Sequence, residues 1–294
     1  MTELTVRRLL VDLESPLPRH WCGGDAFRTA FMNALSMSFP AGEQLFIDSV
    51  RKAMAELQVE PEADLAADSV ADLAADLAAD LVVKQRERLA TEVQAFIGQE
   101  ATHRRIHERF NAHLARQGLV NGWEPRIHAR RSLLEAIDTR NWIAVTAATE
   151  HFTAVFAEYL LSQAAPLAGT EPRLAQMWLW HCAEESEHRS TAFDIYAALG
   201  GNHEWRCRVF KAVAWTFAVD AARQVGLNLW HDGSWWRFST WTSGWTLLFG
   251  RSGLLRLGYA PLKRYLRKDF HPAQGDGSAG VRWLAANAGG WLRR

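Results

Sequence analysis

The sequence predicts an all-α protein built around a four-helix bundle, with extra helices towards its C-terminal end. Three observations lead to this prediction. Apolar residues recur at helical spacing along most of the 294 residues, and few stretches alternate as strands do. Breaks that contain glycine, proline or asparagine separate the long periodic segments. Four of these segments carry an acidic side chain among apolar neighbours.

The first helical segment is expected to begin at Asp25, whose carboxylate can cap a helix, and to continue to about Leu35. Pro40 is expected to interrupt it, because proline lacks the N–H that a helix interior uses. Since proline is tolerated in a first turn, a new or kinked helix should extend from Pro40 to about Leu57.

Residues 60–83 form a low-complexity insertion rich in Asp, Ala and Leu. Its aspartates recur every four residues, at Asp64, Asp68, Asp72, Asp76 and Asp80. Four residues turn a helix by about 400°, so these side chains would form one acidic stripe. Alanine and leucine favour a helix there, although like charges at this spacing repel. A tandem-expanded surface insertion explains the stretch better than an acidic docking or cation-binding face does.

Longer periodic segments follow the insertion. They are expected at Val82–Arg116, Ile127–Gln163 (with a break near Asp138-Thr139), Glu171–Leu199 and His203–Leu229, with shorter helices near 235–249 and 253–268. The tail after His271 is expected to be loose, unless Val281–Leu292 forms a short docked helix. Residues 1–200 would thus form the bundle with its insertion, and residues 201–294 a Trp-rich helical extension packed on it.

Composition argues against several classes of protein. Lys plus Arg equals Asp plus Glu, at 33 each, which gives no support to nucleic-acid binding. Cys22, Cys182 and Cys207 have no close spacing, which argues against a disulfide framework or a cysteine zinc site and favours the cytoplasm. We expect neither a signal peptide nor a transmembrane helix, because no sufficiently long apolar run occurs.

Two Glu-x-x-His pairs, Glu100/His103 and Glu185/His188, lie in the middle of long helical segments. Residues three apart share one face of a helix, so each pair can direct two ligands at one point. Two other helices carry Glu43 and Glu150 among apolar neighbours. A carboxylate on an apolar face is costly unless it is paired or binds a metal.

The order Glu, Glu-x-x-His, Glu, Glu-x-x-His, one group per helix, is that of ferritin-like di-metal carboxylate proteins. Two divalent ions would balance the four carboxylate charges. The sequence therefore predicts a ferritin-like bundle that binds two metal ions. Oxygen and nitrogen ligands favour iron, with manganese or zinc as alternatives.

Five stretches also resemble one known family, namely SFPAGEQLFIDSVR, FIGQEATHRRIHERFN, ATEHFTAVFAEYL, WLWHCAEESEHRSTAFDIY and FGRSGLLRLGYAPLKRYLRKDFHP. On these stretches the chain is similar, over nearly its whole length, to the bacterial "predicted metal-dependent hydrolase" proteins. The resemblance implies a ferritin-like fold in which the metal ligands are Glu43, Glu100, His103, Glu150, Glu185 and His188. The Asp-rich insertion is longer than the usual connection in that family.

Three further histidines are candidates for extra ligands or for partners of ligands. His107 and His181 each lie seven residues from a motif residue, on nearly the same helix face. His151 follows Glu150 and points about 100° away from it, which favours a supporting or structural role. Glu185 is preferred to its neighbour Glu184 as the ligand, and Glu187 is expected at the surface.

An iron pair in a bundle core predicts an O₂-dependent oxidoreductase that acts on an apolar small molecule, with an external electron donor if it is an oxygenase. The alternative is a two-metal hydrolase of an ester or phosphate, as the resemblance suggests. A third interpretation is non-enzymatic handling of iron or oxidants. Glycine-rich phosphate motifs and the G-x-S-x-G elbow are absent from the sequence.

Nine of the 14 tryptophans lie after residue 200, beside a basic run from Arg251 to Lys268. Seven of them lie within 41 residues: Trp205, Trp215, Trp230, Trp235, Trp236, Trp241 and Trp245. Packing against the bundle is the favoured interpretation. The alternatives are the wall of an apolar pocket, and a surface for peripheral membrane contact or for a partner such as a second copy of the chain.

Overall fold

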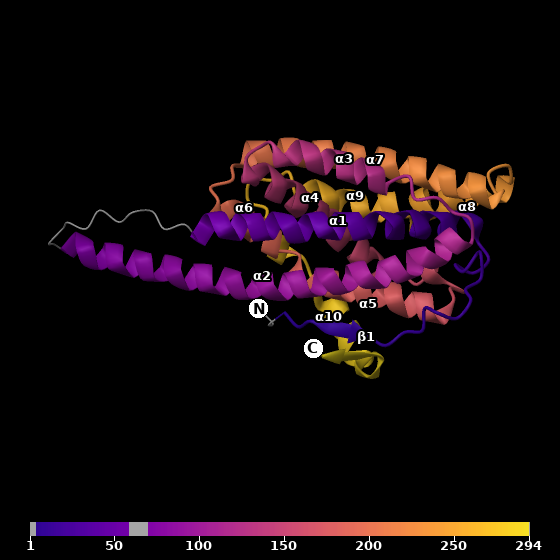
Figure 1. Ribbon diagram of the computed structural model, residues 1–294, viewed down its shortest axis with the longest axis horizontal. Coiled ribbons are helices and arrows are strands. Elements are labelled where there is room, and N and C mark those ends of the chain that lie inside the picture. Colours follow the sequence, from indigo (N-terminus) through magenta and orange to yellow (C-terminus); the bar gives the residue numbers. More distant parts are fainter. Residues whose placement is uncertain (1–3, 59–69, 294) are drawn as a thin grey trace.

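The computed structural model describes residues 4–58 and 70–293, and this part of the chain is almost entirely helical (Figure 1). The helices are α1 (Ala26–Gln58), α2 (Val70–Arg116), α3 (Glu124–Glu135), α4 (Thr139–Ser162), α5 (Pro172–His188), α6 (Thr191–Ala198), α7 (His203–Asp232), α8 (Phe238–Phe249), α9 (Leu254–Arg264) and α10 (Ser278–Ala286). One-turn 3₁₀ segments lie at Ala165–Leu167, Pro272–Gln274 and Ala288–Gly290. The prediction of an all-α protein is confirmed.

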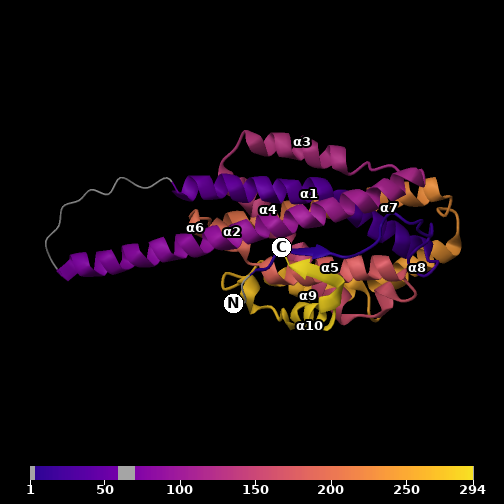
Figure 2. The same cartoon turned by 60° about the horizontal axis from the view of Figure 1, so that its bottom comes forward.

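Two short strands join the beginning and the end of the described chain. β1 (Arg7–Leu9) and β2 (Trp291–Arg293) pair antiparallel, with Arg8 opposite Leu292. Figures 1 and 2 show this pair beside α5 and α10. Within the described residues, no helix combines the length and the apolar character needed to cross a bilayer.

The central helices pack in pairs. α1 packs along α2, α4 packs along α5, and α1 also contacts α4 (Figure 2). α7 lies against α1 and α4, while α10 lies against α5. The N-terminal part of α2 extends beyond the other helices in both views. Asp64 and Asp68 of the expected acidic stripe lie outside the described residues, and α2 already begins at Val70, within the low-complexity insertion.

Three apolar clusters lie in the interior of the described chain, and the smallest contains Phe210, Tyr265 and Phe270. The central helices contribute to the two larger clusters or lead from one to the other. The first cluster contains Leu35, Phe110, Leu160 and Met177. The second contains Val50, Phe96, Ile143 and Ile195. The glutamates singled out in the sequence fall between these positions along α1, α2, α4 and α5. A polar layer therefore crosses the bundle between two apolar clusters.

The expected interruption at Pro40 is wrong, because α1 is continuous from Ala26 to Gln58. Proline cannot donate to the carbonyl four residues earlier, which here belongs to Ser36. The Nδ2 of Asn111 donates to this carbonyl instead, at 2.9 Å. A neighbouring helix thus replaces the lost hydrogen bond, and the chain can continue as a helix past the proline.

The single helix expected at Glu171–Leu199 is in fact two helices, since α5 ends at His188 and α6 begins at Thr191. The change of direction lets α6 bury Ala192 and Ile195 in the second cluster. The break expected near Asp138 occurs, and Asp138 is the N-cap of α4. Local sequence indicated the break at Asp138 but not the break between α5 and α6.

The tail after His271 is docked rather than loose. α10 packs on α5 and buries Leu284. Gly280 allows this close approach, because a Cβ at that position would lie 2.9 Å from the carbonyl oxygen of Ala183. The expectation of a loose tail is therefore wrong, and the alternative of a short docked helix is closer, with bounds of Ser278–Ala286.

Candidate metal centre

Four helices each place one glutamate in the polar layer: Glu43 on α1, Glu100 on α2, Glu150 on α4 and Glu185 on α5. None of the four is more than 3% exposed. His103 and His188 follow Glu100 and Glu185 by three residues, and both are buried. The structure thus brings together all six residues that the sequence analysis proposed as ligands.

Potential ligand atoms form two groups in this layer. Glu43, His103 and His181 form one group, and Glu100, Glu185 and His188 form the other. Within each group the ligand atoms lie within 4.8 Å of one another. Each group is a cluster of oxygen and nitrogen donors, which is the mixture that suits iron, manganese or zinc.

Glu150 lies beside one of these groups, whereas Glu185 lies between the two. Oε2 of Glu150 lies 3.3 Å from Nε2 of His188, beside the second group. Oε1 of Glu185 lies 3.1 Å from Nε2 of His181, 3.5 Å from Nδ1 of His103 and 3.5 Å from Nε2 of His188. The Glu185 carboxylate therefore faces ligand atoms of both groups at once.

The polar layer leaves many buried atoms without a hydrogen bond. Among the described residues, both carboxylate oxygens of Glu43, Glu100 and Glu150 have no hydrogen-bond partner. The same holds for Nδ1 of His103 and Nε2 of His188. A buried charge of this kind is costly unless it is paired or coordinates a metal. With Oε2 of Glu185, nine of the buried side-chain atoms that lack a hydrogen bond in the described chain belong to the proposed ligands, so the residues present fit a pair of metal ions.

Burial and the neighbouring charges shift the pKa values of the carboxylates in this layer. Burial, followed by repulsion from Glu100, raises the pKa of Glu43 well above its usual value. Burial also raises the pKa of Glu150, to about 8. The pKa of Glu185 is well below its usual range, because His188, His103 and His181 outweigh the effect of burial. Protons would therefore take the place of metal on some of these carboxylates.

Each of three histidines turns one ring nitrogen towards the layer and one away from it. The outward nitrogens bind partners: Nε2 of His103 lies 3.0 Å from Glu184, Nδ1 of His188 lies 2.9 Å from the Gln99 Oε1, and Nδ1 of His181 lies 2.7 Å from the His107 Nε2. A donor nitrogen on the outer side leaves a lone pair on the inner side. This is how proteins orient histidine ligands of metals.

Arg7 of β1 connects two of these partners. Its Nη1 lies 3.1 Å from Glu184 and 2.7 Å from Glu187, and Glu187 in turn accepts a hydrogen bond of 2.9 Å from Nε2 of Gln99. The expectation that Glu187 lies at the surface is wrong, since its side chain is 9% exposed. Glu187 instead orients Gln99, which accepts from His188.

His107 extends the network away from the layer. Its Nδ1 lies 2.8 Å from the Ser36 Oγ, which donates to the Asn111 Oδ1. Burial lowers the pKa of His107 well below its usual value, so its ring is neutral. A neutral His107 accepts from His181 and donates to Ser36, and this fixes the tautomer that leaves Nε2 of His181 free for the layer.

His151 lies outside the polar layer. Its Nε2 is 3.3 Å from the carbonyl oxygens of Pro261 and Leu262, and its ring packs against Tyr265 and Phe270. Burial lowers its pKa to about 4. The structure thus places His151 in the contact between α4 and the segment around α9, away from the ligand groups.

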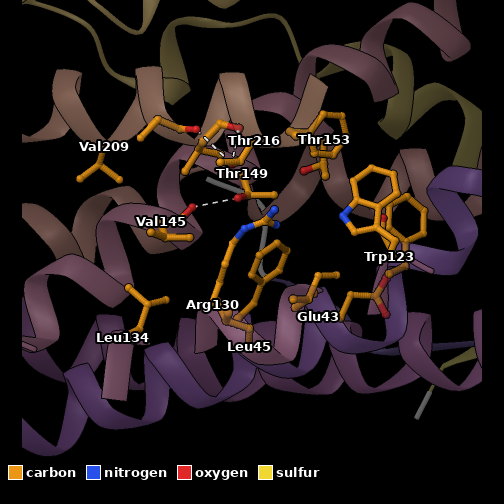
Figure 3. Close-up of a pocket in the computed structure, with 18 of the residues that line it drawn as sticks. Glu43, Leu45, Trp123, Arg130, Leu134, Val145, Thr149, Thr153, Val209 and Thr216 are labelled. Atoms are coloured by element: carbon orange, nitrogen blue, oxygen red, sulfur yellow. Dashed lines mark hydrogen bonds between the residues drawn. The ribbon is translucent and has the colours of Figure 1, made fainter. Parts of the chain in front are cut away.

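A pocket of about 390 Å³ adjoins the layer, and its wall includes Glu43, His181 and Glu185. Most of its other lining residues are apolar and come from α1, α3, α4 and α7. Figure 3 shows Arg130 of α3 reaching into this pocket, with Glu43 in its wall. Arg130 and Arg126 both pair with the buried Asp220 of α7, so one positive charge is left over at this side of the pocket.

Several supporting residues escaped the sequence analysis. Arg7 lies more than 170 residues away from the two glutamates it binds, as the separations of 177 and 180 show. No spacing rule within one helix can reveal such a pair. Gln99 and Glu184 carried a weak signal, since each directly precedes a proposed ligand in the QE and EE dipeptides.

These features define a helical protein with a buried, carboxylate- and histidine-rich centre suited to metal ions. A family model described as "predicted metal-dependent hydrolase" matches residues 5–71 and 73–276. The chain belongs to this family, and the resemblance inferred from sequence is confirmed. Searches of curated proteins and of solved structures gave no match. The family and the two ligand groups together support metal ions as cofactors.

Proposed function

We propose that this chain is a two-metal hydrolase of an ester or phosphate on a largely apolar small molecule. The observation that carries this proposal is that two buried groups of metal ligands lie at the wall of one apolar pocket. The family description supports hydrolysis. The ferritin-like arrangement of α1, α2, α4 and α5 is part of the proposal.

The proposed ligands divide between two positions. Glu43, His103 and His181 would hold one ion, and Glu100, Glu150 and His188 the other. Glu185 would bridge them, because its Oε1 faces histidine nitrogens of both groups. His181, considered from the sequence as either a ligand or a partner of one, is here proposed as a ligand. Bound ions would supply Lewis acidity and activated water for hydrolysis or, if redox-active, electrons for O₂.

The pocket residues would bind and orient the substrate. Its apolar lining excludes water from the apolar part of the molecule, which leaves the reacting group at the end near Glu43 and Glu185. The guanidinium of Arg130 can hold an anionic group of the substrate, since Asp220 is shared with Arg126. We therefore expect substrates with an apolar body and an acidic group.

A second candidate is an O₂-dependent oxidoreductase with an external electron donor. One observation favours it: the donors are all carboxylates and imidazoles, buried within a helical bundle, which is the setting of di-iron and di-manganese carboxylate proteins. Iron is the ion this candidate requires, whereas hydrolysis would also proceed with manganese or zinc.

Both candidates can be tested on the same preparations. The purified chain would be loaded anaerobically with Zn²⁺, Mn²⁺ or Fe²⁺, and its metal content measured. Release of nitrophenol from nitrophenyl esters and phosphates with increasingly long apolar groups would report hydrolysis, and an oxygen electrode would report O₂ use. Metal-dependent hydrolysis supports the main proposal. O₂ consumption with Fe²⁺ and no hydrolysis supports the second candidate.

Variants make the assignment specific. Glu185→Ala should lower metal content and activity together, and His181→Ala should remove about one of the two ions. Glu108→Ala is the matched control, because Glu108 lies on the exposed face of α2. Unchanged metal content in both site variants would refute the metal centre itself.

A further inference from the structure

The segment from Gly233 to Lys268, which contains α8 and α9, has an unusual distribution of charge. It contains no Asp or Glu, but it does contain seven cations: Arg237, Arg251, Arg256, Lys263, Arg264, Arg267 and Lys268. Arg267 pairs with Asp269 just beyond the segment. Within the part of the chain that the structure describes, no ion pair involves any of the other six. This segment is therefore strongly cationic although the chain as a whole has zero net charge, and of its cations only Arg264 and Arg267 line a pocket of the described chain that also contains acidic residues, namely Glu158, Asp269 and Asp276.

α8 carries an apolar stripe that faces solvent. Phe238, Trp241, Trp245 and Phe249 follow one another at spacings of three, four and four, so they share one face of the helix. Their exposed fractions are 83%, 42%, 66% and 46%. The opposite face, with Thr240 and Gly244, is buried. The preceding turn adds Trp236, which is 78% exposed.

α9 continues the same pattern. Leu255 and Tyr259 are exposed and lie one helical turn apart. Arg256 and Lys263 lie beside them, and Nζ of Lys263 is 6.0 Å from the centre of the Tyr259 ring. Apolar and aromatic side chains flanked by cations are typical of helices that lie in the interface of a membrane. Packing on the bundle, which the sequence analysis favoured for the tryptophans, does not account for these exposed rings.

An apolar cavity lies directly behind this surface. It has a volume of about 550 Å³, and its wall includes Trp241 and Leu248 of α8 and Leu255 of α9. Trp241 and Leu255 therefore belong both to the exposed surface and to the cavity wall. Phe39 and Phe217 line this cavity and also the pocket at the metal centre. The surface thus lies beside apolar space suited to a hydrocarbon chain.

We propose that α8 and α9 form a docking surface for an anionic lipid bilayer. Tryptophan and tyrosine prefer the boundary between water and hydrocarbon, and lysine and arginine are attracted by anionic headgroups. The charge complementarity decides between a bilayer and a second copy of this chain, because two such positive surfaces would repel each other. The proposal does not depend on which reaction the metal centre performs.

Flotation of the full chain with vesicles tests this docking. Vesicles of phosphatidylcholine would be compared with vesicles that also contain phosphatidylserine. We expect binding to the mixed vesicles, weakened by added salt because the attraction is partly electrostatic. Replacing Phe238 and Trp245 by serine should lower the partition coefficient at least about tenfold, since large exposed rings are lost. Arg256→Ser and Lys263→Ser should each lower it about fivefold.

Controls use comparable residues elsewhere on the surface. Trp215→Ser removes an equally exposed tryptophan from α7, and Arg51→Ser removes an exposed cation from α1. Both variants should float like the wild type. Absence of flotation, or equal loss in the controls, would overturn the proposal. So would sedimentation as a dimer that dissociates in the Phe238/Trp245 variant and does not bind vesicles, because the surface would then belong to a second copy.

Discussion

At the proposed metal centre, the hydrogen bond made by the outer nitrogen of each histidine determines whether the inner nitrogen can bind a metal. Glu184 accepts from His103 and Gln99 accepts from His188, so a neutral ring at either position has its lone pair on the inner nitrogen, where a metal could bind it. A carboxylate partner also makes the imidazole a stronger donor towards a metal. The affinity of the centre for metal is therefore expected to depend on residues that would not touch the ions.

Glu184→Gln tests this dependence. The glutamine keeps the size and one acceptor oxygen of Glu184, but it removes the charge next to His103. We expect metal affinity to fall by about tenfold to a hundredfold, while the fold is retained. A competition titration with a chromogenic chelator measures this. Glu108→Gln, an exposed change on α2, should leave affinity as it is. Equal affinities in both variants would contradict the role given to Glu184.

Arg7→Met tests the ion pairs that Arg7 of β1 makes with Glu184 and Glu187. Arg7 is 7% exposed and pairs with both Glu184 and Glu187, so its loss leaves these two nearly buried carboxylates without their guanidinium partner. Removing one partner of a buried ion pair costs about 3–5 kcal/mol of unfolding free energy. Urea denaturation of the metal-free protein measures the cost. Arg8→Met, at the exposed neighbouring position of β1, should cost little, and a similar loss in both variants would argue against the pairing.

At the scale of single helices, caps and lateral hydrogen bonds matter more than helix propensity. α1 passes Pro40 because Asn111 of α2 binds the carbonyl that the proline cannot serve. This carbonyl belongs to Ser36, and the hydroxyl of Ser36 contacts His107. The proline position is therefore tied to the network that orients His181. α4 depends instead on an N-cap, because the Asp138 side chain accepts a hydrogen bond from the backbone N–H of Arg140.

Asp138→Ala should destabilise the protein by about 1 kcal/mol at neutral pH, because α4 loses its N-cap. The hydrogen bond and charge of Arg140 lower the pKa of Asp138 from 3.8 to about 2. A carboxylate with a lowered pKa stabilises the fold fully above the unfolded-state value and loses this effect as pH falls towards 2. The difference between wild type and Asp138→Ala should therefore shrink below about pH 4.

Urea midpoints recorded between pH 7 and pH 3 would show this trend. Asp138→Asn is the control, since asparagine also caps a helix but carries no charge. It should retain most of the stability at neutral pH. If the two substitutions were equally destabilising at neutral pH, the cap would not be the cause.

For the whole molecule, the proposed metal centre lies where four helices meet, between two apolar clusters. Four carboxylates from four helices repel one another, and the raised pKa values of Glu43, Glu100 and Glu150 show that repulsion and burial are not compensated by the protein alone. Metal ions would replace this repulsion with attraction. The N-terminal strand β1 also supports this layer, because its pairing with the C-terminal strand β2 holds Arg7 next to Glu184 and Glu187.

Removal of metal should consequently destabilise the entire bundle. A ligand present at about 1,000 times its Kd stabilises a folded protein by about 4 kcal/mol. Chelation should therefore lower the Tm by roughly 10 °C. Reloading should release protons, because the carboxylates that are protonated without metal must ionise. Differential scanning calorimetry and a pH indicator measure the two effects. A Tm that does not respond to metal would contradict a centre shared by four helices.

Much of this architecture could be predicted from local patterns. Helical periodicity predicted nearly every helix, and the glycine at 118 marks a helix end with a φ of 82° as expected. Four of the six proposed ligands stood out as Glu-x-x-His pairs on one helix face, and Glu43 and Glu150 stood out because each interrupts an apolar stretch. Neither signal needs knowledge of distant residues. The family was recognisable from the same motifs.

Three-dimensional packing decided what local patterns could not. Arg7, Gln99 and Glu187 support the centre through contacts across 88 to 180 residues of chain, which no helical spacing encodes. Packing between helices kept α1 continuous through Pro40 and docked the C-terminal tail on α5. It also left the rings of α8 exposed, although their sequence alone favoured burial. Local physics sets which segments are helical and which faces are apolar, whereas only the tertiary structure determines which partner each face meets.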